Sequence, residues 1–164
     1  MVSSGFKYRF IAMGGTFDHI HRGHKALLHR AFETGEAVFI GLTSDAFARR
    51  EGKIIDQSFE ERKKNLESYL RQEFPNRRYE ISKLEDRFGP AIFSDKIDAI
   101  AVSSETFPAV EAANRKRREL GLQDLKAEVV PMIIADDGTR ISSTRIRSGE
   151  INAEGNLVKK EGQE

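Results

Sequence analysis

Residues 8–24 read YRFIAMGGTFDHIHRGH, in which an apolar run leads to two glycines and then to three of the protein's four histidines. The β-rich run over residues 8–13 favours a buried strand, and a helical pattern begins at about His21. Gly14 and Gly15 allow the backbone between these two elements to approach a ligand closely. The stretch therefore predicts a strand, a glycine turn and a helix N-terminus, which together open a βαβ unit.

The rest of the chain repeats this alternation of short strands and helices. Further β-rich runs lie at residues 37–42, 79–84, 97–102 and 128–134, and helical patterns lie at residues 21–33, 58–74 and 108–120. Ser58 and Glu61 form a capping-box pattern at the start of the second helix, and Gly121 follows the third as a C-cap. Consecutive βαβ units predict a single Rossmann-like α/β domain over residues 1–164, with a parallel sheet of about five strands and helices on both faces. Residues 152–164 form a polar tail that we expect to fray.

Charge and composition narrow the possible classes of function. The chain has 27 Lys and Arg against 26 Asp and Glu, a net charge of +1, which argues against a strongly basic nucleic-acid binder. It has no cysteine, which excludes disulfides, thiolate nucleophiles and cysteine-ligated zinc and indicates a reducing cytoplasm. No apolar run approaches the ~20 residues of a membrane span, and the first residues lack a signal-peptide hydrophobic stretch. We therefore expect a cytoplasmic protein that binds neither nucleic acid nor membranes.

The histidines follow the first predicted strand, at the sheet edge where parallel α/β proteins bind ligands. His21 and His24 are three residues apart and so project from one face of the helix's first turn, where free N–H groups and the dipole favour an anion. Together with Thr16 they form a donor cage suited to phosphate, and Gly23 leaves the turn unobstructed. His29 lies further along the helix, where a surface or satisfied core position is the simpler interpretation.

Two other interpretations of this cluster remain open. A zinc site would need three or four ligands, which could come from Asp18, His19, His21 and His24. The spacing matches no familiar metal motif, and incidental loop polarity is the second alternative. A P-loop is excluded, because the GK pair at residues 52–53 is followed by Ile54, and no GxGxxG follows a strand.

A second polar motif follows the fifth predicted strand, where residues 136–147 read DDGTRISSTRIR. Ser142, Ser143 and Thr144 precede a helical stretch and supply N-cap groups, and arginines flank them. Taken alone, these hydroxyl residues are more simply helix caps. In a parallel sheet, however, they would lie at the same edge as the histidines. We therefore expect them to form the other half of a triphosphate site.

The two motifs together carry a family resemblance. They read Gly15-Thr16-Phe17-Asp18 with His21-x-Gly23-His24 and, about 120 residues later, Ile141-Ser142-Ser143-Thr144-x-x-Arg147. This pair resembles the H-x-G-H and ISSTxxR signatures of the nucleotidylyltransferase superfamily. Further stretches resemble the archaeal type of phosphopantetheine adenylyltransferase, and the resemblance runs roughly from Phe10 to Gly155. Examples are Ile40-Gly41-Leu42-Thr43-Ser44-Asp45 and Lys83-Leu84-Glu85-Asp86.

The resemblance implies transfer of an adenylyl group from ATP to 4′-phosphopantetheine, by in-line displacement at the α-phosphate without a covalent intermediate. It implies catalytic roles for His21, Thr16 and Lys53. The ATP-binding residues that it implies are Gly14, Gly15, Thr16, Phe17, His21, Gly23, His24, Ser142, Ser143, Thr144 and Arg147. The acceptor-binding residues are Thr16, Lys53, Asn114 and Arg117. Mg²⁺ is expected to arrive with ATP, bridging phosphate oxygens, and no protein metal ligand is assigned.

Other functions are compatible with the same motifs. The acceptor could instead be nicotinamide mononucleotide, FMN or glycerol phosphate, since all would use the same nucleotide site. A non-catalytic nucleotide sensor and an RNA-binding module are alternatives of another class. The intact histidine and hydroxyl set argues against the sensor, and the near-zero charge and absence of RNP-like aromatic motifs argue against RNA. The oligomeric state is not indicated by the sequence.

Overall fold

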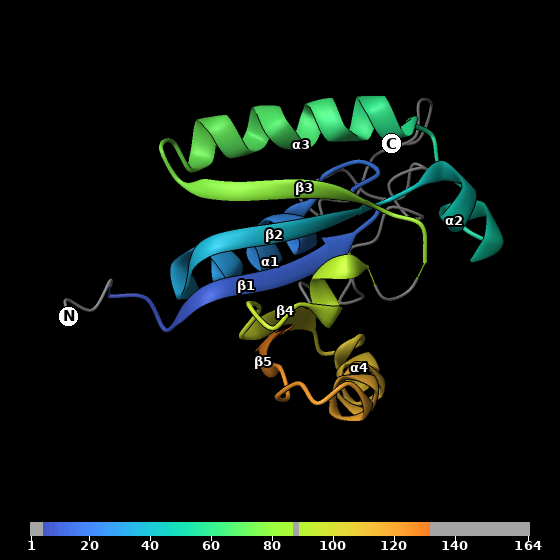
Figure 1. Cartoon of the computed structure of the whole chain (residues 1–164). Helices are drawn as coiled ribbons and strands as arrows, with labels where there is room; N and C mark the ends of the chain where they lie inside the picture. Colours follow the sequence, from blue (N-terminus) through green and yellow to red (C-terminus); the bar gives the residue numbers. More distant parts are fainter. Residues whose placement is uncertain (1–4, 87–88, 132–164) are drawn as a thin grey trace, which may run out of the picture.

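Five parallel strands form one sheet in the order β3-β2-β1-β4-β5 (Figure 1). This is a computed structural model, which describes residues 5–86 and 89–131. The strands are β1 (Tyr8–Gly15), β2 (Gly35–Thr43), β3 (Arg78–Leu84), β4 (Ala99–Ser103) and β5 (Lys126–Val130). Each of the five predicted β-rich runs forms a strand, so the predicted parallel α/β sheet is confirmed.

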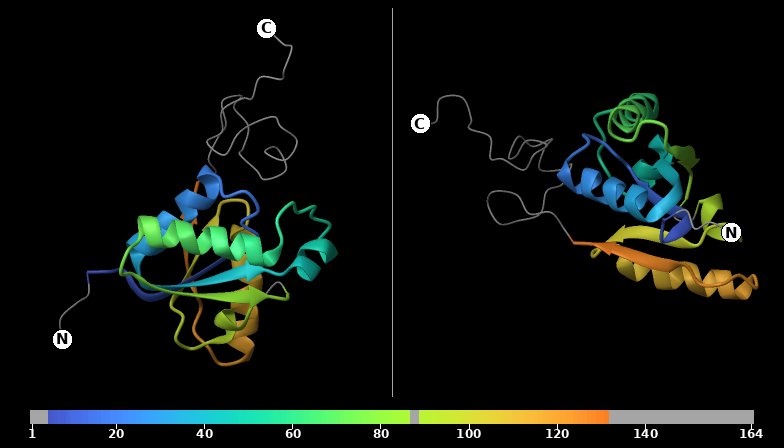
Figure 2. Two further views of the ribbon diagram at one scale, coloured as in Figure 1. Left: turned by 90° about the horizontal axis from the view of Figure 1, so that it is seen from above. Right: turned by 90° about the vertical axis from the view of Figure 1, so that its left-hand side faces the viewer.

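Helices cover both faces of the sheet, as expected. They are α1 (Arg22–Thr34), α2 (Asp45–Arg50), α3 (Phe59–Glu73) and α4 (Phe107–Glu119), with a short 3-10 helix η1 (Pro90–Phe93). Figure 2 shows α1 and α3 on one face and α4 on the other. The sequence analysis missed α2 and η1, while the helix expected after Ser142 and the tail at residues 152–164 lie outside the described residues.

The order of the strands determines where in the sheet a ligand site is expected. The chain runs from β1 through α1 to β2 on one side, and from β4 through α4 to β5 on the other, so the order reverses between β1 and β4. Parallel α/β sheets bind ligands at such a switch point, beyond the carboxyl ends of the strands. The loop that leaves β1 and carries the histidines begins at this point.

Alternate residues of β1 supply the two halves of the core. Ile11 and Met13 are buried in the larger cluster, which α1 and α3 complete with Leu28, Phe32, Leu66 and Leu70. Ala12 and the partly buried Phe10 point to the opposite face, where Ile97 and Leu125 are buried. Side chains of a strand alternate between the two faces of the sheet, and helices cover both faces here. Both sets of β1 side chains are therefore buried.

Helix ends follow local sequence signals. The Ser58 hydroxyl accepts a hydrogen bond from the Glu61 N–H at the start of α3, as the capping-box pattern predicts. Gly121 follows α4 with a φ of +76°, the left-handed conformation expected of a C-cap glycine. The cap predictions at these two helices are therefore confirmed.

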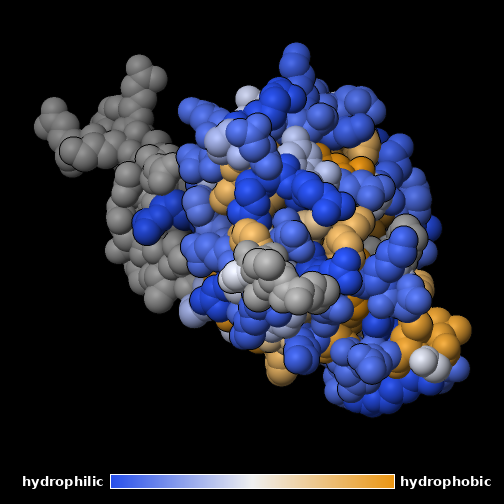
Figure 3. All heavy atoms as spheres, turned by 60° about the vertical axis from the view of Figure 1, so that its left-hand side comes forward, coloured by the Kyte–Doolittle hydropathy of each residue, from blue (hydrophilic) through white to orange (hydrophobic). Residues whose placement is uncertain are grey.

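One face of the described part is largely polar. The face shown in Figure 3 is mostly hydrophilic, with small scattered apolar areas. Among the helices within residues 5–86 and 89–131, none is long and apolar enough to span a membrane.

Candidate active site

The start of α1 is capped by two histidines. His21 is the N-cap, and its Nδ1 accepts hydrogen bonds from the N–H groups of Gly23 (3.1 Å) and His24 (3.4 Å). In return, His24 Nδ1 accepts from the His21 N–H at 3.2 Å. This is a capping box in which imidazoles take the places usually held by a hydroxyl and a carboxylate. The two rings stack with their centroids 3.8 Å apart.

These hydrogen bonds fix where each imidazole carries its proton. A ring nitrogen that accepts from a backbone N–H has no proton of its own, so a neutral ring is protonated on the other nitrogen. His21 and His24 both accept at Nδ1. Each ring therefore presents an Nε2–H donor from the helix N-terminus.

Both histidines are neutral donors near neutral pH. Burial, with a further contribution from His19, lowers the pKa of His21 to about 4. Burial also lowers the pKa of His24 well below its ordinary value, helped by His21 and by the nearby charge of Lys53. The site thus combines uncharged imidazole donors with one ammonium group close by.

The small and aromatic residues of the motif shape this cap. A Cβ at Gly23 would lie 2.9 Å from His21 Cε1, so a side chain here would displace the capping ring. Phe17 is fully buried, and its ring centroid lies 4.9 Å from that of His24. A Cβ at Gly15 would come within 3.0 Å of the Phe17 ring. Gly15 therefore leaves room for the Phe17 ring, and Gly23 leaves room for the His21 ring. Phe17 in turn packs against His24.

Lys53 reaches this edge from a different loop. Its Nζ donates to the Thr16 hydroxyl at 3.3 Å, although 37 residues separate the two in sequence. The structure thus brings together Thr16, Lys53 and the histidine cap, as the family resemblance implies. Their roles toward a substrate remain predictions.

The loop that carries Lys53 is fastened to the loop after β1. The Asp18 carboxylate accepts from the N–H groups of Asp56 (3.1 Å) and Gln57 (3.0 Å). His19 pairs with Asp56 at 2.7 Å, and its backbone N–H donates to the Gln57 side chain. The sequence analysis missed Asp56 and Gln57, since both lie far along the chain from Asp18.

The structure does not assemble the four ligands considered for zinc. In the described part of the chain, the group close enough to hold a metal is Asp18, His19 and Asp56, with ligand atoms within 4.8 Å of one another. His21 and His24 are not members of it. The three residues that do gather already bond to one another or to the Lys53 loop.

Asn114 and Arg117 lie at the opposite edge, where the strands begin. Asn114 is buried and exchanges two hydrogen bonds with the Leu125 backbone, just before β5. Arg117 is 2% exposed and donates to backbone carbonyls. Both side chains hold loops together at this edge, and their implied acceptor-binding role stays a prediction.

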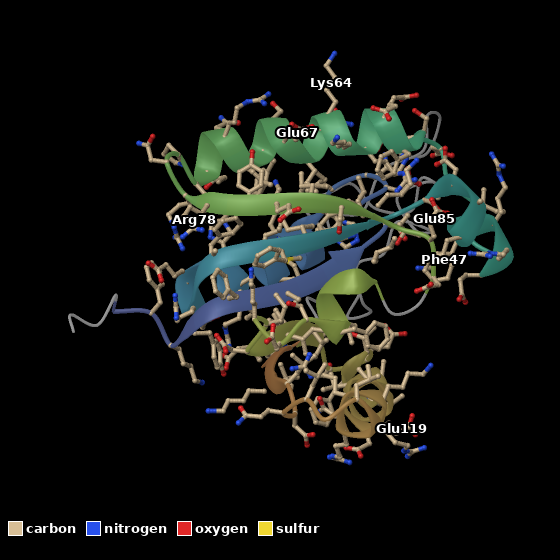
Figure 4. The ribbon with its side chains drawn as sticks, in the orientation of Figure 1. Phe47, Lys64, Glu67, Arg78, Glu85 and Glu119 are labelled. Carbon is tan, nitrogen blue, oxygen red and sulfur yellow. The ribbon has the colours of Figure 1, made fainter. Side chains whose placement is uncertain are left out.

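An apolar cavity of about 100 Å³ opens beside the carboxyl ends of β1, β2 and β3. Its lining includes Gly14, Phe39, Gly41, Leu84, Ile92 and Ile100. The Leu84 side chain lies against the glycines, since a Cβ at Gly41 would come within 2.6 Å of Leu84 Cγ. Figure 4 shows Glu85, the next residue, beside α2, where it accepts a hydrogen bond from Ser44. The cavity borders β1 at Gly14, which is two residues before Thr16.

The second motif cannot be placed in the same way. Ser142, Ser143, Thr144 and Arg147 lie outside the described residues. β5 is parallel to β4 and to the rest of the sheet, so the chain leaves it at the edge that also carries the histidine cap.

The fold and the site define a nucleotidyltransferase of the cytidylyltransferase-like class, and residues 12–149 match that family. A phosphopantetheine adenylyltransferase from Methanothermobacter thermautotrophicus is 44% identical over 154 residues, covering 94% of this chain and 92% of the relative. One from Pyrococcus abyssi is 42% identical over 159 residues, covering 94% and 99%. The chain therefore belongs to the phosphopantetheine adenylyltransferase family, which confirms the resemblance seen in the sequence.

A solved structure supports the fold. The crystal structure of a protein of unknown function from Archaeoglobus fulgidus matches with a TM-score of 0.65 and 30% identity. The match covers 76% of this chain and 99% of that one.

Proposed function

We propose that this protein transfers the adenylyl group of ATP to 4′-phosphopantetheine, giving dephospho-coenzyme A and pyrophosphate. The observation that carries the proposal is the pair of imidazole Nε2–H donors beside the Thr16–Lys53 contact. Relatives that share most of the chain are named for this activity. A non-catalytic sensor would need the nucleotide donors but not an ammonium group held against Thr16.

The chemistry needs positioning more than acid–base catalysis. An oxygen of the acceptor phosphate attacks the α-phosphorus, forming one P–O bond, while the bond from the α-phosphorus to the departing pyrophosphate oxygen breaks. The acceptor is already an anion near neutral pH, so no covalent nucleophile or strong base is required. Holding two anions in line and stabilising the charge that develops are then the protein's main tasks.

The residues at the cap suit these tasks. We assign the His21 Nε2–H to an α-phosphate oxygen and the His24 Nε2–H to the nucleotide phosphates or ribose. The Thr16 hydroxyl, held by Lys53, lies between the acceptor phosphate and the α-phosphate. Because the pKa of His21 is lowered to about 4, the ring donates without adding positive charge or losing its proton to the acceptor. We assign the β- and γ-phosphates to residues 142–144 and Arg147.

Mg²⁺ enters as part of the Mg-ATP substrate. Mg²⁺ favours oxygen ligands and commonly keeps several waters while binding substrate phosphates. The carboxylates described near the cap, Asp18 and Asp56, already hold the Lys53 loop. We therefore assign the ion to phosphate oxygens and water, and no protein ligand to it.

The apolar cavity suits the uncharged arm of the acceptor. Its lining is mostly aliphatic and glycine, and it adjoins the strand that delivers Thr16. The uncharged arm of 4′-phosphopantetheine would pack its methyl and methylene groups here while its phosphate stays at Thr16 and Lys53. Glycerol phosphate has no such arm to bury.

The test is to incubate the purified protein with Mg-ATP and each candidate acceptor, following pyrophosphate release and product mass. We expect dephospho-coenzyme A from 4′-phosphopantetheine and little turnover with nicotinamide mononucleotide, FMN or glycerol phosphate. Turnover with another acceptor alone would contradict the assignment. ATP binding without turnover on any acceptor would favour the sensor.

A further inference from the structure

Arg62 is fully buried, although arginine is among the residues most often found at the surface. It lies on α3 and faces the sheet, where it bonds to the Thr43 carbonyl. Lys64, two residues on, points away from the sheet (Figure 4). Removing a guanidinium from water costs several kcal/mol unless its donors are well paired. The contacts that offset this cost therefore indicate what the residue holds together.

The Arg62 guanidinium bonds to four residues, which lie in three separate segments of the chain. Nη1 donates to the Thr16 carbonyl (2.8 Å), just beyond β1, and to the Thr43 carbonyl (2.7 Å), at the end of β2. Nε donates to the Gln57 carbonyl (3.1 Å), in the loop before α3. Nη2 pairs with the Asp45 carboxylate (2.7 Å), at the start of α2. Every nitrogen of the side chain thus has a partner.

Two of these three segments carry Thr16 and Lys53. Thr16 bears the hydroxyl that Lys53 contacts, and its own carbonyl is held by Arg62. Gln57 lies in the loop that carries Lys53, and Asp18 holds its backbone N–H. One guanidinium therefore fixes the backbone on both sides of the Lys53–Thr16 contact.

We propose that Arg62 is a positioning residue for adenylyl transfer, one that sets the separation of Lys53 and Thr16 without touching the substrate. The proposal rests on the proposed function, because it concerns the same site. A lysine could not take its place, since an ammonium is a single point charge whereas the guanidinium holds several donors in one rigid plane.

Arg77 provides a control within the same chain. Its guanidinium also donates to two backbone carbonyls, those of Phe32 and Gly35, at 2.8 Å each. It is half-buried and lies just before β3, at the edge where the strands begin. The two arginines therefore share bonding to backbone carbonyls but differ in location.

The experiment compares Arg62→Lys with Arg77→Lys in unfolding by denaturant and in steady-state kinetics. We expect both variants to unfold at lower denaturant than the wild type. Arg62→Lys should lower kcat by roughly 10- to 100-fold, as small displacements of reacting groups do, with less than about threefold change in KM for ATP. Arg77→Lys should keep kcat within about twofold. An equal loss in both variants, or none in Arg62→Lys, would overturn the proposal.

A double-mutant cycle with Lys53→Met separates positioning from general destabilisation. If Arg62 acts through Lys53, adding Arg62→Lys to the Lys53→Met protein should lower kcat little further. Independent, multiplicative losses would overturn the proposal. Should Arg62→Lys not fold, Asp45→Asn removes the ion pair and leaves the carbonyl bonds. A drop in kcat of about threefold or more then supports the proposal, and an unchanged kcat refutes it.

The wild-type assay distinguishes the two possible failures. A wild type that forms no dephospho-coenzyme A contradicts the proposed function and this inference with it. A wild type that forms product, together with an unimpaired Arg62→Lys variant, contradicts only the role of Arg62.

Discussion

The helices α1 and α3 are both capped by the side chain of their N-cap residue, but different residues form the two caps. At α3, Ser58 accepts from the Glu61 N–H at 3.2 Å, and its hydroxyl donates to the Glu61 carboxylate. At α1, His21 accepts from the His24 N–H, and the His24 ring accepts in return from the His21 backbone N–H. The N-cap thus plays the same part in both helices, whereas the third helical residue accepts from a hydroxyl in α3 and from the backbone in α1.

The difference lies in what remains after capping. The serine hydroxyl is used within its own cap, whereas each imidazole has a second nitrogen that still carries a proton. The first turn of α3 also contains Glu60 and Glu61, which complement the helix dipole, while that of α1 contains no acidic residue. The start of α3 is therefore surrounded by acidic side chains. The start of α1 offers imidazole donors and no acidic side chain, which suits an anion.

The largest effect should come from separating the capping and donating roles of His21. Asparagine caps helices well, so His21→Asn should retain most of the stability, whereas His21→Ala should lose about 1 kcal/mol. Both variants should lower kcat by roughly 10²- to 10³-fold, the usual loss for one donor to a developing charge. ATP affinity should change far less. Steady-state kinetics and ATP titration measure this, and equal losses in kcat and affinity would contradict the role in the transition state.

The next effect is a pH dependence of stability that only the α1 cap should show. Burial lowers the pKa of His21 to about 4 from the ordinary 6.5, so between these values the unfolded chain binds more protons than the folded protein. Stability therefore falls as the pH drops through this window and is unaffected above it. At about 1.4 kcal/mol per pH unit, going from about pH 7 to about pH 5 should cost on the order of 2 kcal/mol.

Denaturant unfolding at several pH values measures this cost. His21→Asn removes the titrating ring, so its stability should fall less steeply over the same range. His24 contributes in the same direction, because its pKa is also lowered by burial. Identical slopes in the wild type and His21→Asn would show that the ring is not held neutral by the fold.

The first strand and the start of α1 near His21 were predictable because they depend on neighbours along the chain, and alternation sets the two faces of β1. The capping of α3 by Ser58 is local in the same way. Such features need no knowledge of tertiary structure, and the structure confirms them. The predicted glycine turn is wrong, because Gly14 and Gly15 continue β1 and the backbone turns after them, with Phe17 and His19 at positive φ. The N–H groups expected to be free at the start of α1 are instead partly taken by the His21 ring.

Contacts between distant segments were not predictable from the pattern alone. Lys53 and Thr16 are 37 residues apart, and the Asp18–Gln57 bond spans 39. Arg117 lies in a charged run, residues 115–118, which the sequence pattern assigned to a solvated helix face or to a ligand site. The structure instead wraps the backbone carbonyls of the neighbouring loops around its guanidinium. Only the fold decides whether a charged side chain faces water, a ligand or buried backbone.

Gly23→Ala tests the space that the imidazole cap needs. The new Cβ would lie 2.9 Å from His21 Cε1, so the ring must move and its donor with it. We expect kcat to fall by roughly tenfold, while stability changes by less than about 1 kcal/mol, since alanine favours the helix. The equivalent position in α3 is Glu60, which is exposed, and Glu60→Ala should leave kcat within about twofold. Comparable kinetics for the two variants would contradict the packing argument.

The smallest effect should come from removing the α3 cap. Ser58→Ala deletes the hydroxyl that accepts from the Glu61 N–H, which should cost about 1 kcal/mol of unfolding free energy. The serine uses its hydroxyl within the cap, so kcat of the folded protein should stay within about twofold. Denaturant unfolding and steady-state kinetics on the same preparation measure both quantities. A loss of kcat as large as that of His21→Asn would mean that the two caps do not differ in function, because a hydroxyl cap would then matter to the reaction as much as an imidazole donor.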